Sequence, residues 1–451
     1  MKILFINASP KGERSVTLQT ARYIEKRYPN ACEYSILHTG AHIKALEKDF
    51  SEAEKAINAA DTIIFVYPVY TFIAPYQLHR FIELTKASGV SCKGKYCAQI
   101  LTSKHFYDVT AMKYIEENAL DLGMRYLGAL SADMDDLQSE AGRYEADCFF
   151  ERLLFDAENG NYVEAPSHAP LAARPAYEPS LPEAEKSEGK DIVVVTNAAT
   201  EDVNLRNMIE DFINASEYPV RVVNVRDFPF RGGCLGCFNC AISGKCVYND
   251  GFEDFLRNDI QRADALIYAF TVSDHYTHSS FKLYDDRQFC NGHRTVTAGK
   301  VTGYIISGEY SKEANLRMIV EARANVSGMY FAGVAGDEGD TGKELATLAK
   351  TVCFALDKGL SAPQNFYGVG GTKIFRDLVY TMQGIMQADH VFYKEHGVYD
   401  FPQKKRGMIV AMKFLGLLMR SPAVQKKMKG QMTKYMLMPY EKVLEKTTPK
   451  V

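Results

Sequence analysis

Short apolar runs alternate with amphipathic stretches along the first third of the chain. Continuous apolar runs cover residues 2–7, 62–67 and 96–101, and a weaker run covers residues 32–37. After the first run, a helical spacing of apolar residues extends over about residues 15–27. Strands that are buried on both faces are continuously apolar, so this alternation predicts a parallel sheet with helices on both faces.

The same order of elements begins again in the second half of the chain. An apolar run at residues 191–196 is followed by a polar loop, by a helical stretch to about Ile213, and by later apolar runs at residues 265–270 and 301–307. Each run alone could belong to a buried helix, but the repetition of the whole order favours strands. We therefore predict an α/β protein with two doubly wound parallel-sheet domains in tandem.

A proline-rich segment separates the two predicted domains. Residues 158–190 contain five prolines, and their later part is rich in glutamate. Prolines remove amide donors and charged side chains resist burial, so we expect a stiff and solvated linker. The predicted domains then span residues 1–157 and 191–363, and a linker of this kind would allow them to pack against each other as a pseudo-dimer.

Length and composition favour a protein of two or three domains. The chain has 451 residues, of which 46% are hydrophobic, and its net formal charge of −3 predicts no general attraction to nucleic acid. It contains no run of about 18 apolar residues, and its first apolar run is too short for a signal peptide. We therefore expect a cytoplasmic protein whose ten cysteines are thiols or metal ligands.

A hydroxyl-rich loop follows the first predicted strand. Residues 9–17 read Ser-Pro-Lys-Gly-Glu-Arg-Ser-Val-Thr, and a helix is predicted to begin within them. Free amides at a helix start, together with the helix dipole, favour a phosphate, and nearby hydroxyl and basic side chains would add donors and charge. The candidate phosphate-binding residues are Ser9, Lys11, Arg14, Ser15, Val16 and Thr17. The alternative is a capped helix after a turn, because the loop has neither of the common glycine-rich nucleotide motifs.

This loop resembles the FMN phosphate loop of flavodoxin-like NAD(P)H-dependent FMN reductases and quinone reductases. A second stretch, residues 67–83, is similar to the loop after the third strand of that family, in which Pro-x-Tyr is followed by Pro and then by Leu-x-x-Phe-Ile. The resemblance covers about residues 1–150. It implies a flavodoxin-like fold that binds FMN at the carboxyl ends of the strands, where open α/β sheets bind their ligands.

Further candidate residues lie where the flavin ring would bind. Backbone groups of residues 69–72 could hydrogen-bond its pyrimidine edge, and an aromatic side chain could cover one of its faces. The candidates are Pro68, Val69, Tyr70, Thr71 and Phe72, with Ser103 from a loop after the next strand that could close the site. For the aromatic side chains, ordinary packing in the core remains the alternative.

Four of the ten cysteines fall within thirteen residues of the second half. Cys234, Cys237, Cys240 and Cys246 have the spacing C-x2-C-x2-C-x5-C, which allows four thiolates to reach one compact iron–sulfur cluster. Two alternatives remain open: a structural zinc ion, although zinc sites usually pair two separated Cys-x2-Cys motifs, or a site without metal. The cysteines of the first half are scattered, and we expect them in the core.

The cysteine run resembles the compact motif of the iron–sulfur flavoprotein family, whose members carry FMN and one 4Fe-4S cluster on a flavodoxin-like chain. The turn at residues 249–252 and the stretch at residues 280–287 also resemble that family. The resemblance implies that the four cysteines of the run hold one 4Fe-4S cluster. Both halves of the chain are therefore predicted to be flavodoxin-like domains.

The two halves of the chain complement each other. In the second half, the loop that corresponds to residues 9–17 contains Glu201 and Asp202, whose charges would repel a phosphate, and the Pro-x-Tyr loop is replaced. The first half has no cysteine run. We therefore predict FMN in the first domain and the cluster in the second, with electrons passing across their contact, while one FMN in each half remains the alternative.

These features predict an FMN-dependent NAD(P)H oxidoreductase or an electron-transfer protein. A flavin takes up a hydride and releases electrons singly or in pairs, so no acid–base pair is required, and we expect His275, His278 and His293 to be ordinary loop histidines. The donor would be NAD(P)H or a redox protein such as a ferredoxin, and the acceptor a quinone-like small molecule or a protein partner. The alternative is a non-catalytic binding or scaffold protein with a zinc ion or an empty cysteine site.

The alternation of strands and helices stops near Phe366, and residues 364–451 form a tail of different composition. Residues 401–440 contain nine Lys or Arg, seven Met and no Asp or Glu. The apolar stretch at residues 408–419 is too short to span a bilayer. We expect a basic helical tail that docks on protein, with peripheral contact to an anionic membrane as the alternative. A homodimer is also compatible with the sequence.

Overall fold

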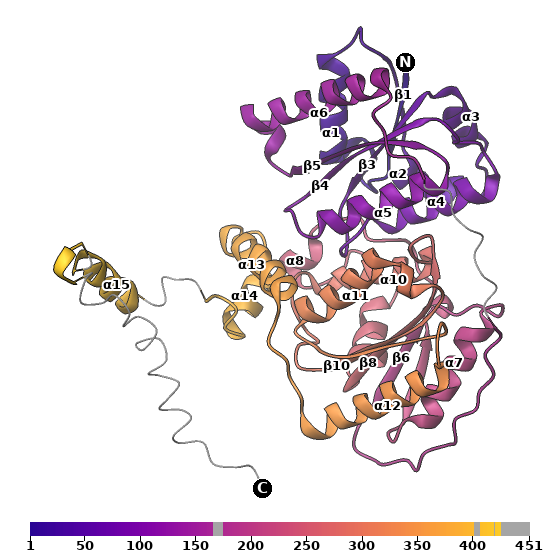
Figure 1. Cartoon of the computed structure of the whole chain (residues 1–451), viewed down its shortest axis with the longest axis vertical. Coiled ribbons are helices and arrows are strands. Elements are labelled where there is room, and N and C mark those ends of the chain that lie inside the picture. Colours follow the sequence, from indigo (N-terminus) through magenta and orange to yellow (C-terminus); the bar gives the residue numbers. More distant parts are fainter. Residues whose placement is uncertain (166–174, 401–405, 419, 425–451) are drawn as a thin grey trace. The chain divides into compact units, whose positions relative to one another are not determined.

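Two parallel sheets, each with helices on both faces, organise residues 1–392, which form one compact unit (Figure 1). The computed structural model describes residues 1–165, 175–400, 406–418 and 420–424. The chain from Tyr393 onward belongs to a second unit. The predicted fold class, two doubly wound parallel-sheet domains in tandem, is confirmed.

The first sheet consists of parallel strands in the order β2-β1-β3-β4-β5. They are β1 (Lys2–Asn7), β2 (Glu33–Leu37), β3 (Thr62–Pro68), β4 (Tyr96–Ser103) and β5 (Arg125–Asp133). The sequence predicts the first four of these strands. It does not reveal β5, because this edge strand is only partly buried and a bulge near Gly128 interrupts its pairing with β4.

Helices connect these strands and bury their apolar faces on the sheet. They are α1 (Val16–Arg27), α2 (Thr39–Leu46), α3 (Ser51–Ala59), α4 (Tyr76–Ser88), α5 (Asp108–Asp121) and α6 (Glu140–Asn159). Phe5, Leu18 and Phe150 belong to the core on one face of the sheet, and Tyr67 and Leu78 to the core on the other. The loops that follow β1, β3 and β4 share one edge of the sheet and carry the candidate flavin residues.

The second sheet repeats this topology with the strand order β7-β6-β8-β10-β11. Its strands are β6 (Ile192–Thr196), β7 (Val220–Asn224), β8 (Ala265–Ser273), β10 (Val301–Ser307) and β11 (Tyr330–Gly336). The short strand β9 (Tyr276–Thr277) turns back antiparallel to β8. The sequence locates β6, β8 and β10 as apolar runs, whereas the edge strands β7 and β11 are partly exposed and carry no such run.

Helices also cover both faces of the second sheet. α7 (Val203–Ala215) and α12 (Thr341–Lys358) pack on one face, and α10 (Ser279–Arg287) and α11 (Ala314–Ser327) on the other. The further helices of this half are α8 (Asn239–Ser243), α9 (Phe252–Phe255), α13 (Phe366–Thr381) and α14 (Gln387–Glu395). The predicted tail begins with α13, which packs against α11 within the first unit. This part of the tail therefore covers the second domain.

The two domains contact each other through helices that occupy equivalent places. α4 follows β3 and α10 follows β8, and these two helices pack together, as do α5 and α11. Figure 1 shows α4 and α5 facing α10 and α11. The expected packing of the domains as a pseudo-dimer is therefore observed.

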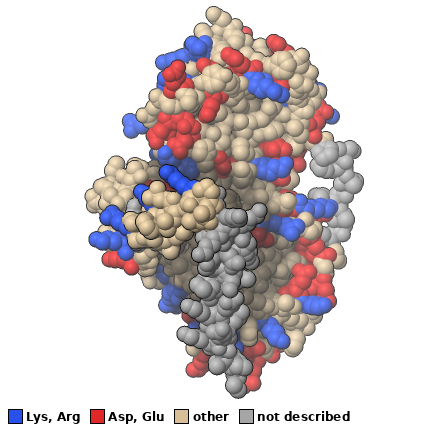
Figure 2. Space-filling view, turned by 60° about the vertical axis from the view of Figure 1, so that its left-hand side comes forward, with Lys and Arg blue, Asp and Glu red and all other residues tan. Residues whose placement is uncertain are grey.

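Charged side chains are not segregated by sign on the face that Figure 2 shows. Acidic and basic residues are interspersed over both domains there. This distribution accords with the small net charge of −3.

The described second half of the predicted linker lies on α7. The buried carboxylate of Asp211 accepts hydrogen bonds from the hydroxyl of Tyr177 and from the amides of Ser180 (3.0 Å) and Leu181 (2.9 Å). Tyr177 and Leu181 also pack against the core of the second domain. Donors that lie between the prolines anchor this segment to α7, while most of its described residues stay exposed, as expected of a solvated linker. Residues 166–174 lie outside the described residues.

Helix α15 (Arg406–Leu418) belongs to the unit that starts at Tyr393. The side chains of Met408, Phe414 and Leu417 are exposed on it. Within the described part of the chain, no helix is long and apolar enough to cross a membrane. Other parts of the basic tail lie outside the described residues, namely residues 401–405, 419 and 425–451, and the partner of the tail stays a prediction.

Replacing Asp211 by alanine is expected to release the linker segment from α7. The variant loses a buried acceptor for several donors, which should lower the free energy of unfolding by about 1–3 kcal/mol. Limited proteolysis with trypsin should then cut faster after Lys186, which lies in the released segment. Glu210→Ala, at an exposed position of the same helix, is the control and should leave cleavage unchanged. Equal cleavage of the two variants would contradict this role of Asp211.

Candidate functional site

The predicted phosphate loop is a helix start with buried hydroxyls. The side-chain amide of Asn7, at the end of β1, donates a hydrogen bond to the carbonyl of Gly12 (2.9 Å) and closes the loop. Ser15 caps α1 by accepting a hydrogen bond from a first-turn amide (3.3 Å). The amides of Val16 and Thr17 have no acceptor within the helix, so they remain available to an anion.

The second candidate loop is a tight turn between Tyr70 and Ile73. Each of these residues donates its amide to the carbonyl of the other, at 2.8 and 3.1 Å. Thr71 and Phe72 have positive φ angles of 44° and 72°, a backbone region that residues other than glycine seldom adopt. Such strain persists only where the surroundings hold the backbone in place, and it is common at binding sites.

A cavity of about 210 Å³ joins both loops to the cysteine run. The predicted residues that line it are Ser9, Lys11, Ser15, Val16, Thr17, Pro68, Val69, Tyr70, Thr71 and Ser103 from the first domain and Cys234, Cys237, Cys240 and Cys246 from the second. Arg14 and Phe72 lie outside the lining, and Phe72 packs in the core beside Phe106 and Tyr107. The structure therefore brings the two predicted sites together in one cavity.

Several lining residues are missing from the sequence prediction. They include Thr102, Lys104, Phe106 and Met134 of the first domain, Arg287, Phe289, Cys290 and His293 of the second, and Phe375 and Leu378 of α13. Apolar side chains make up much of this part of the cavity lining, which we call the apolar wall. Thr102, Lys104 and Phe106 lie with Ser103 in the loop that the sequence suggests as a cover, and Arg287 lies in the stretch at residues 280–287. No local motif marks the other positions, because they come together only in the folded chain.

The cysteine loop is anchored by Arg287 at the end of α10. Its guanidinium is buried, pairs with Asp250 at 2.8 Å and donates a hydrogen bond to the carbonyl of Gly232 at 2.9 Å. It also lies over the rings of Tyr248 and Phe252, 4.4 and 4.9 Å from their centroids. One side chain thus holds both ends of the loop, which gives a structural role to the acidic turn and to the arginine of the motif.

Burial disfavours the charged form of two cysteines in this loop. It raises the pKa of the Cys240 thiol to about 11 and also raises the pKa of Cys234 well above its usual value. Burial therefore favours the neutral thiol at these positions, and a bound cation would favour the thiolate.

In the second domain, the loop that corresponds to the phosphate loop of the first domain forms hydrogen bonds with its own side chains. Asp202 accepts hydrogen bonds from the amide of Ala199 (2.8 Å) and from the hydroxyl of Thr271 (3.0 Å), so its carboxylate takes the place that a phosphate would need. The β8–β9 hairpin replaces the tight turn of the first domain. Both differences accord with the predicted loss of the flavin pattern in the second half.

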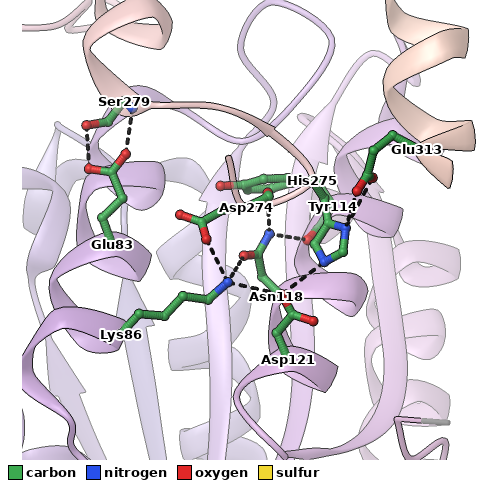
Figure 3. A network of polar contacts seen from close by, with 9 residues as sticks. All are labelled: Glu83, Lys86, Tyr114, Asn118, Asp121, Asp274, His275, Ser279 and Glu313. Carbon is green, nitrogen blue, oxygen red and sulfur yellow. Dashed lines mark hydrogen bonds and ion pairs between the residues drawn. The ribbon is translucent and has the colours of Figure 1, made fainter. Parts of the chain in front are cut away.

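His275, at the tip of that hairpin, links the two domains (Figure 3). Its ring nitrogens lie 3.0 Å from Asp121 of α5 and 3.1 Å from Glu313 at the start of α11. Lys86 of α4 pairs with Asp121 (3.2 Å) and Asp274 (2.8 Å). Burial opposes the charged ring, but the hydrogen bonds to the two carboxylates outweigh it and raise the pKa of His275 to about 10. This residue is therefore part of the domain contact and not an ordinary loop histidine.

His293 also has a partner that the sequence does not reveal. Its Nδ1 atom lies 2.8 Å from a carboxylate oxygen of Asp389, which is fully buried on α14. Its ring packs on Phe375 at 4.5 Å between centroids. Since His293 lines the cavity, the expectation of an ordinary loop position is wrong for this residue as well.

Comparisons with known proteins agree with this architecture. Residues 1–135 match a family model described as flavodoxin-like fold. A protein of Archaeoglobus fulgidus named iron-sulfur flavoprotein is 26% identical over 173 residues, which cover 36% of this chain and 78% of that protein.

Solved structures resemble part of the chain. An NADPH-quinone reductase from P. pentosaceus has 17% identity and a TM-score of 0.27, over 34% of this chain and 97% of that one. An FMN-dependent NADH-azoreductase from Bacillus anthracis has 16% identity and a TM-score of 0.27, over 36% of this chain and 99% of that one.

The fold defines a protein of two flavodoxin-like α/β domains. Its first domain matches the flavodoxin-like fold model over residues 1–135, and the resemblance inferred from the sequence is confirmed.

Replacing His275 by asparagine is expected to remove a pH-dependent part of the domain contact. The folded-state pKa is raised from 6.5 to about 10, so the contribution is complete below about pH 6.5 and is lost as the pH rises through about 10. In this window the free energy of unfolding of the wild type should fall more steeply than that of His275→Asn, by at most about 1.4 kcal/mol per pH unit. Urea unfolding at several pH values measures the slope.

The control for this experiment is His42→Asn, at an exposed position of the first domain. It should keep the wild-type slope, because its ring takes no part in the domain contact. Parallel slopes of the wild type and His275→Asn would show that the ion pairs of His275 do not contribute to stability.

Proposed function

We propose that this chain is a flavin-dependent redox protein in which FMN binds to the first domain and a 4Fe-4S cluster to the cysteine loop of the second. The observation that carries the proposal is the single cavity lined by both sets of residues. Electrons would pass between the two groups within this cavity. The relative named iron-sulfur flavoprotein, 26% identical over 173 residues, supports the pairing of these two groups.

The loops of the first domain fit FMN by the chemistry of their donors. The buried hydroxyls of Ser9, Ser15 and Thr17, with the free amides of α1, would bind its phosphate, and Lys11 would add positive charge. The turn at residues 70–73 would hold its ring system. When bound, FMN supplies hydride uptake and the release of one or two electrons. The residues of the chain bind and orient this group, and the apolar wall excludes water.

The cysteine loop fits a cluster better than a single zinc ion. Tetrahedral coordination at about 2.3 Å would bring the sulfur atoms to about 3.8 Å from one another. Among the residues that the structure describes, no three of the four sulfur atoms lie within 4.8 Å of one another. Thiols spread in this way leave room for a larger group, which their spacing in the sequence also favours.

The cysteine loop lies in close contact with the turn at residues 70–73, which we call the flavin turn. Gly236, between Cys234 and Cys237, has a φ of 59°, and a Cβ atom there would lie 2.0 Å from the hydroxyl of Tyr70. Any other residue at position 236 would collide with the side chain of Tyr70, so that this side chain or one of the loops would have to shift. This close contact would give electrons a short path between the two groups.

The electron donor in this proposal is NAD(P)H or a redox protein, and the acceptor is a quinone-like small molecule or a protein partner. The wall that Phe106, Phe289 and Phe375 form suits a flat aromatic acceptor, since aromatic rings stack on one another and apolar walls favour such ligands.

Acidic residues in the phosphate loop are expected to abolish flavin binding. In a Ser15→Glu/Thr17→Glu variant, two carboxylates would occupy the phosphate site and repel the ligand, leaving less than about a tenth of the wild-type flavin content. Reconstitution with FMN followed by visible absorption measures this content. Lys26→Glu, an exposed position in the last turn of α1, makes the same change of net charge and should bind normally. Full flavin content in the double variant would refute this assignment of the FMN site.

Loss of two cysteines should remove iron and leave flavin in place. Wild-type protein purified without oxygen is expected to contain about four iron and four sulfide per chain, and Cys234→Ser/Cys240→Ser almost none. Cys148→Ser is the control; Cys148 is exposed on α6, which corrects the expectation that the first-half cysteines lie in the core. Zinc, or no metal, in the wild type would remove the cluster from the proposal.

A further inference from the structure

Helix α10 of the second domain reaches the flavin turn of the first domain. Its side chains Lys282 and Asp286 are fully buried and form an ion pair with each other. Lys282 donates hydrogen bonds to the carbonyl of Tyr70 (2.9 Å) and to the hydroxyl of Thr71 (2.7 Å). Asp286 accepts hydrogen bonds from the hydroxyl of Thr71 (2.6 Å) and from the amide of Tyr76 (2.7 Å). Groups of the first domain therefore satisfy both charges.

These contacts act where the backbone of the turn is strained. Thr71 and Phe72 both have positive φ, a conformation that costs energy for residues with a side chain. The hydroxyl of Thr71 accepts a hydrogen bond from Lys282 and donates one to Asp286, so both charges act on a strained residue. The second domain thus supplies a constraint that keeps the turn in its shape.

An equivalent contact runs in the opposite direction. Tyr76 and Ser279 are the first residues of α4 and α10, so Glu83 of α4 corresponds to Asp286 of α10. Glu83 accepts hydrogen bonds from the amide (2.6 Å) and the hydroxyl (2.7 Å) of Ser279 (Figure 3). α4 and α10 therefore each provide a carboxylate to the first residue of the other helix, and the two carboxylates occupy equivalent positions.

Lys282, the cation of the buried ion pair, has no cationic counterpart in α4. The position of Lys282 is taken in α4 by His79, which is buried and stacks on Tyr114 at 4.2 Å between centroids. Burial lowers the pKa of His79 well below its usual value, so the ring is neutral. Its Nε2 atom has no hydrogen-bond partner in the described part of the chain. At this position, α4 therefore has no cation equivalent to Lys282, and the charged contacts of the first domain with the β8–β9 hairpin come from Lys86 and Asp121 instead.

We propose that Lys282 and Asp286 are positioning residues for the flavin site, which act through the turn at residues 70–73 and hold it in the shape that accepts the flavin ring. This inference rests on the proposed function, which places FMN in the first domain. It goes further, because it makes the flavin site of one domain depend on two side chains of the other. His79 takes the equivalent position in α4, so a buried Lys–Asp pair of this kind occurs on one side of the domain contact only.

An experiment must distinguish the positioning of the flavin turn by Lys282 and Asp286 from their contribution to the stability of the folded protein. Removing one member of a buried ion pair leaves an unpaired charge, whereas replacing both by apolar residues of similar size is often tolerated. Lys282→Met/Asp286→Leu therefore removes the hydrogen bonds to the turn and leaves no unpaired charge. Thr71→Val is a second variant, which keeps both charges and removes only the hydroxyl between them. The control is Ser280→Ala on the same helix, whose hydroxyl contacts Asn197 within the second domain.

In the full chain, the double variant should bind FMN about tenfold more weakly or worse, and Thr71→Val should show a smaller loss in the same direction. Quenching of FMN fluorescence measures the affinity. The visible circular dichroism of the bound flavin should also change, because the ring loses its fixed surroundings. Competition by inorganic phosphate, which reports on the loop at residues 9–17, should stay at the wild-type level. Ser280→Ala should match the wild type in every measurement.

Three results would overturn the inference. Wild-type affinity and circular dichroism in the folded double variant, or in Thr71→Val if the double variant fails to fold, would remove the positioning role and leave the proposed function intact. A parallel loss of phosphate competition would place the defect in the whole domain and not in the turn. Failure of the wild type to bind FMN would overturn the proposed function, and this inference with it.

Discussion

The buried ion pair between Lys282 and Asp286 is the contact on which the arrangement of this protein depends. Charges that are removed from water are costly unless they are paired and hydrogen-bonded, so this pair holds its partners firmly. The neighbouring residues extend its effect, because Asp285 pairs with Arg323 of the same domain and Arg287 holds the cysteine loop. The end of one helix thereby joins the core of the second domain, the flavin turn and the cysteine loop.

The two domains have the same topology but carry different parts of the proposed site. Their strand orders agree, and equivalent helices form their contact. The phosphate loop of the first domain presents free amides, whereas Asp202 fills its counterpart, and the cysteine run occurs only in the second half. Because one chain carries both halves, the phosphate loop of the first domain always meets one cysteine loop of the second, an arrangement that two separate chains would reach only by association.

The parts of this protein that the sequence predicts are the local ones. The central strands appear as continuous apolar runs because both of their faces are buried, and the phosphate loop and the cysteine run are each contiguous in the chain. The edge strands β5, β7 and β11 are partly exposed and leave no such run. Arg287, Asp389 and Phe375 could not be assigned to the site, because each depends on contacts between residues that lie far apart in the sequence.

The shared cavity also constrains how electrons leave the protein under the proposed function. A flavin holds up to two electrons, whereas one cluster passes them on singly. With one proposed flavin site for each cysteine loop, the two electrons of the flavin would reach the cluster one after the other. Limited access from solvent would suppress side reactions of a partly reduced group, and apolar side chains such as Phe289 and Phe375 line this cavity. Under the proposed function, the contacts of Lys282 and Asp286 with the turn at residues 70–73 and the residues of α13 that line the cavity would both fix the surroundings of the flavin.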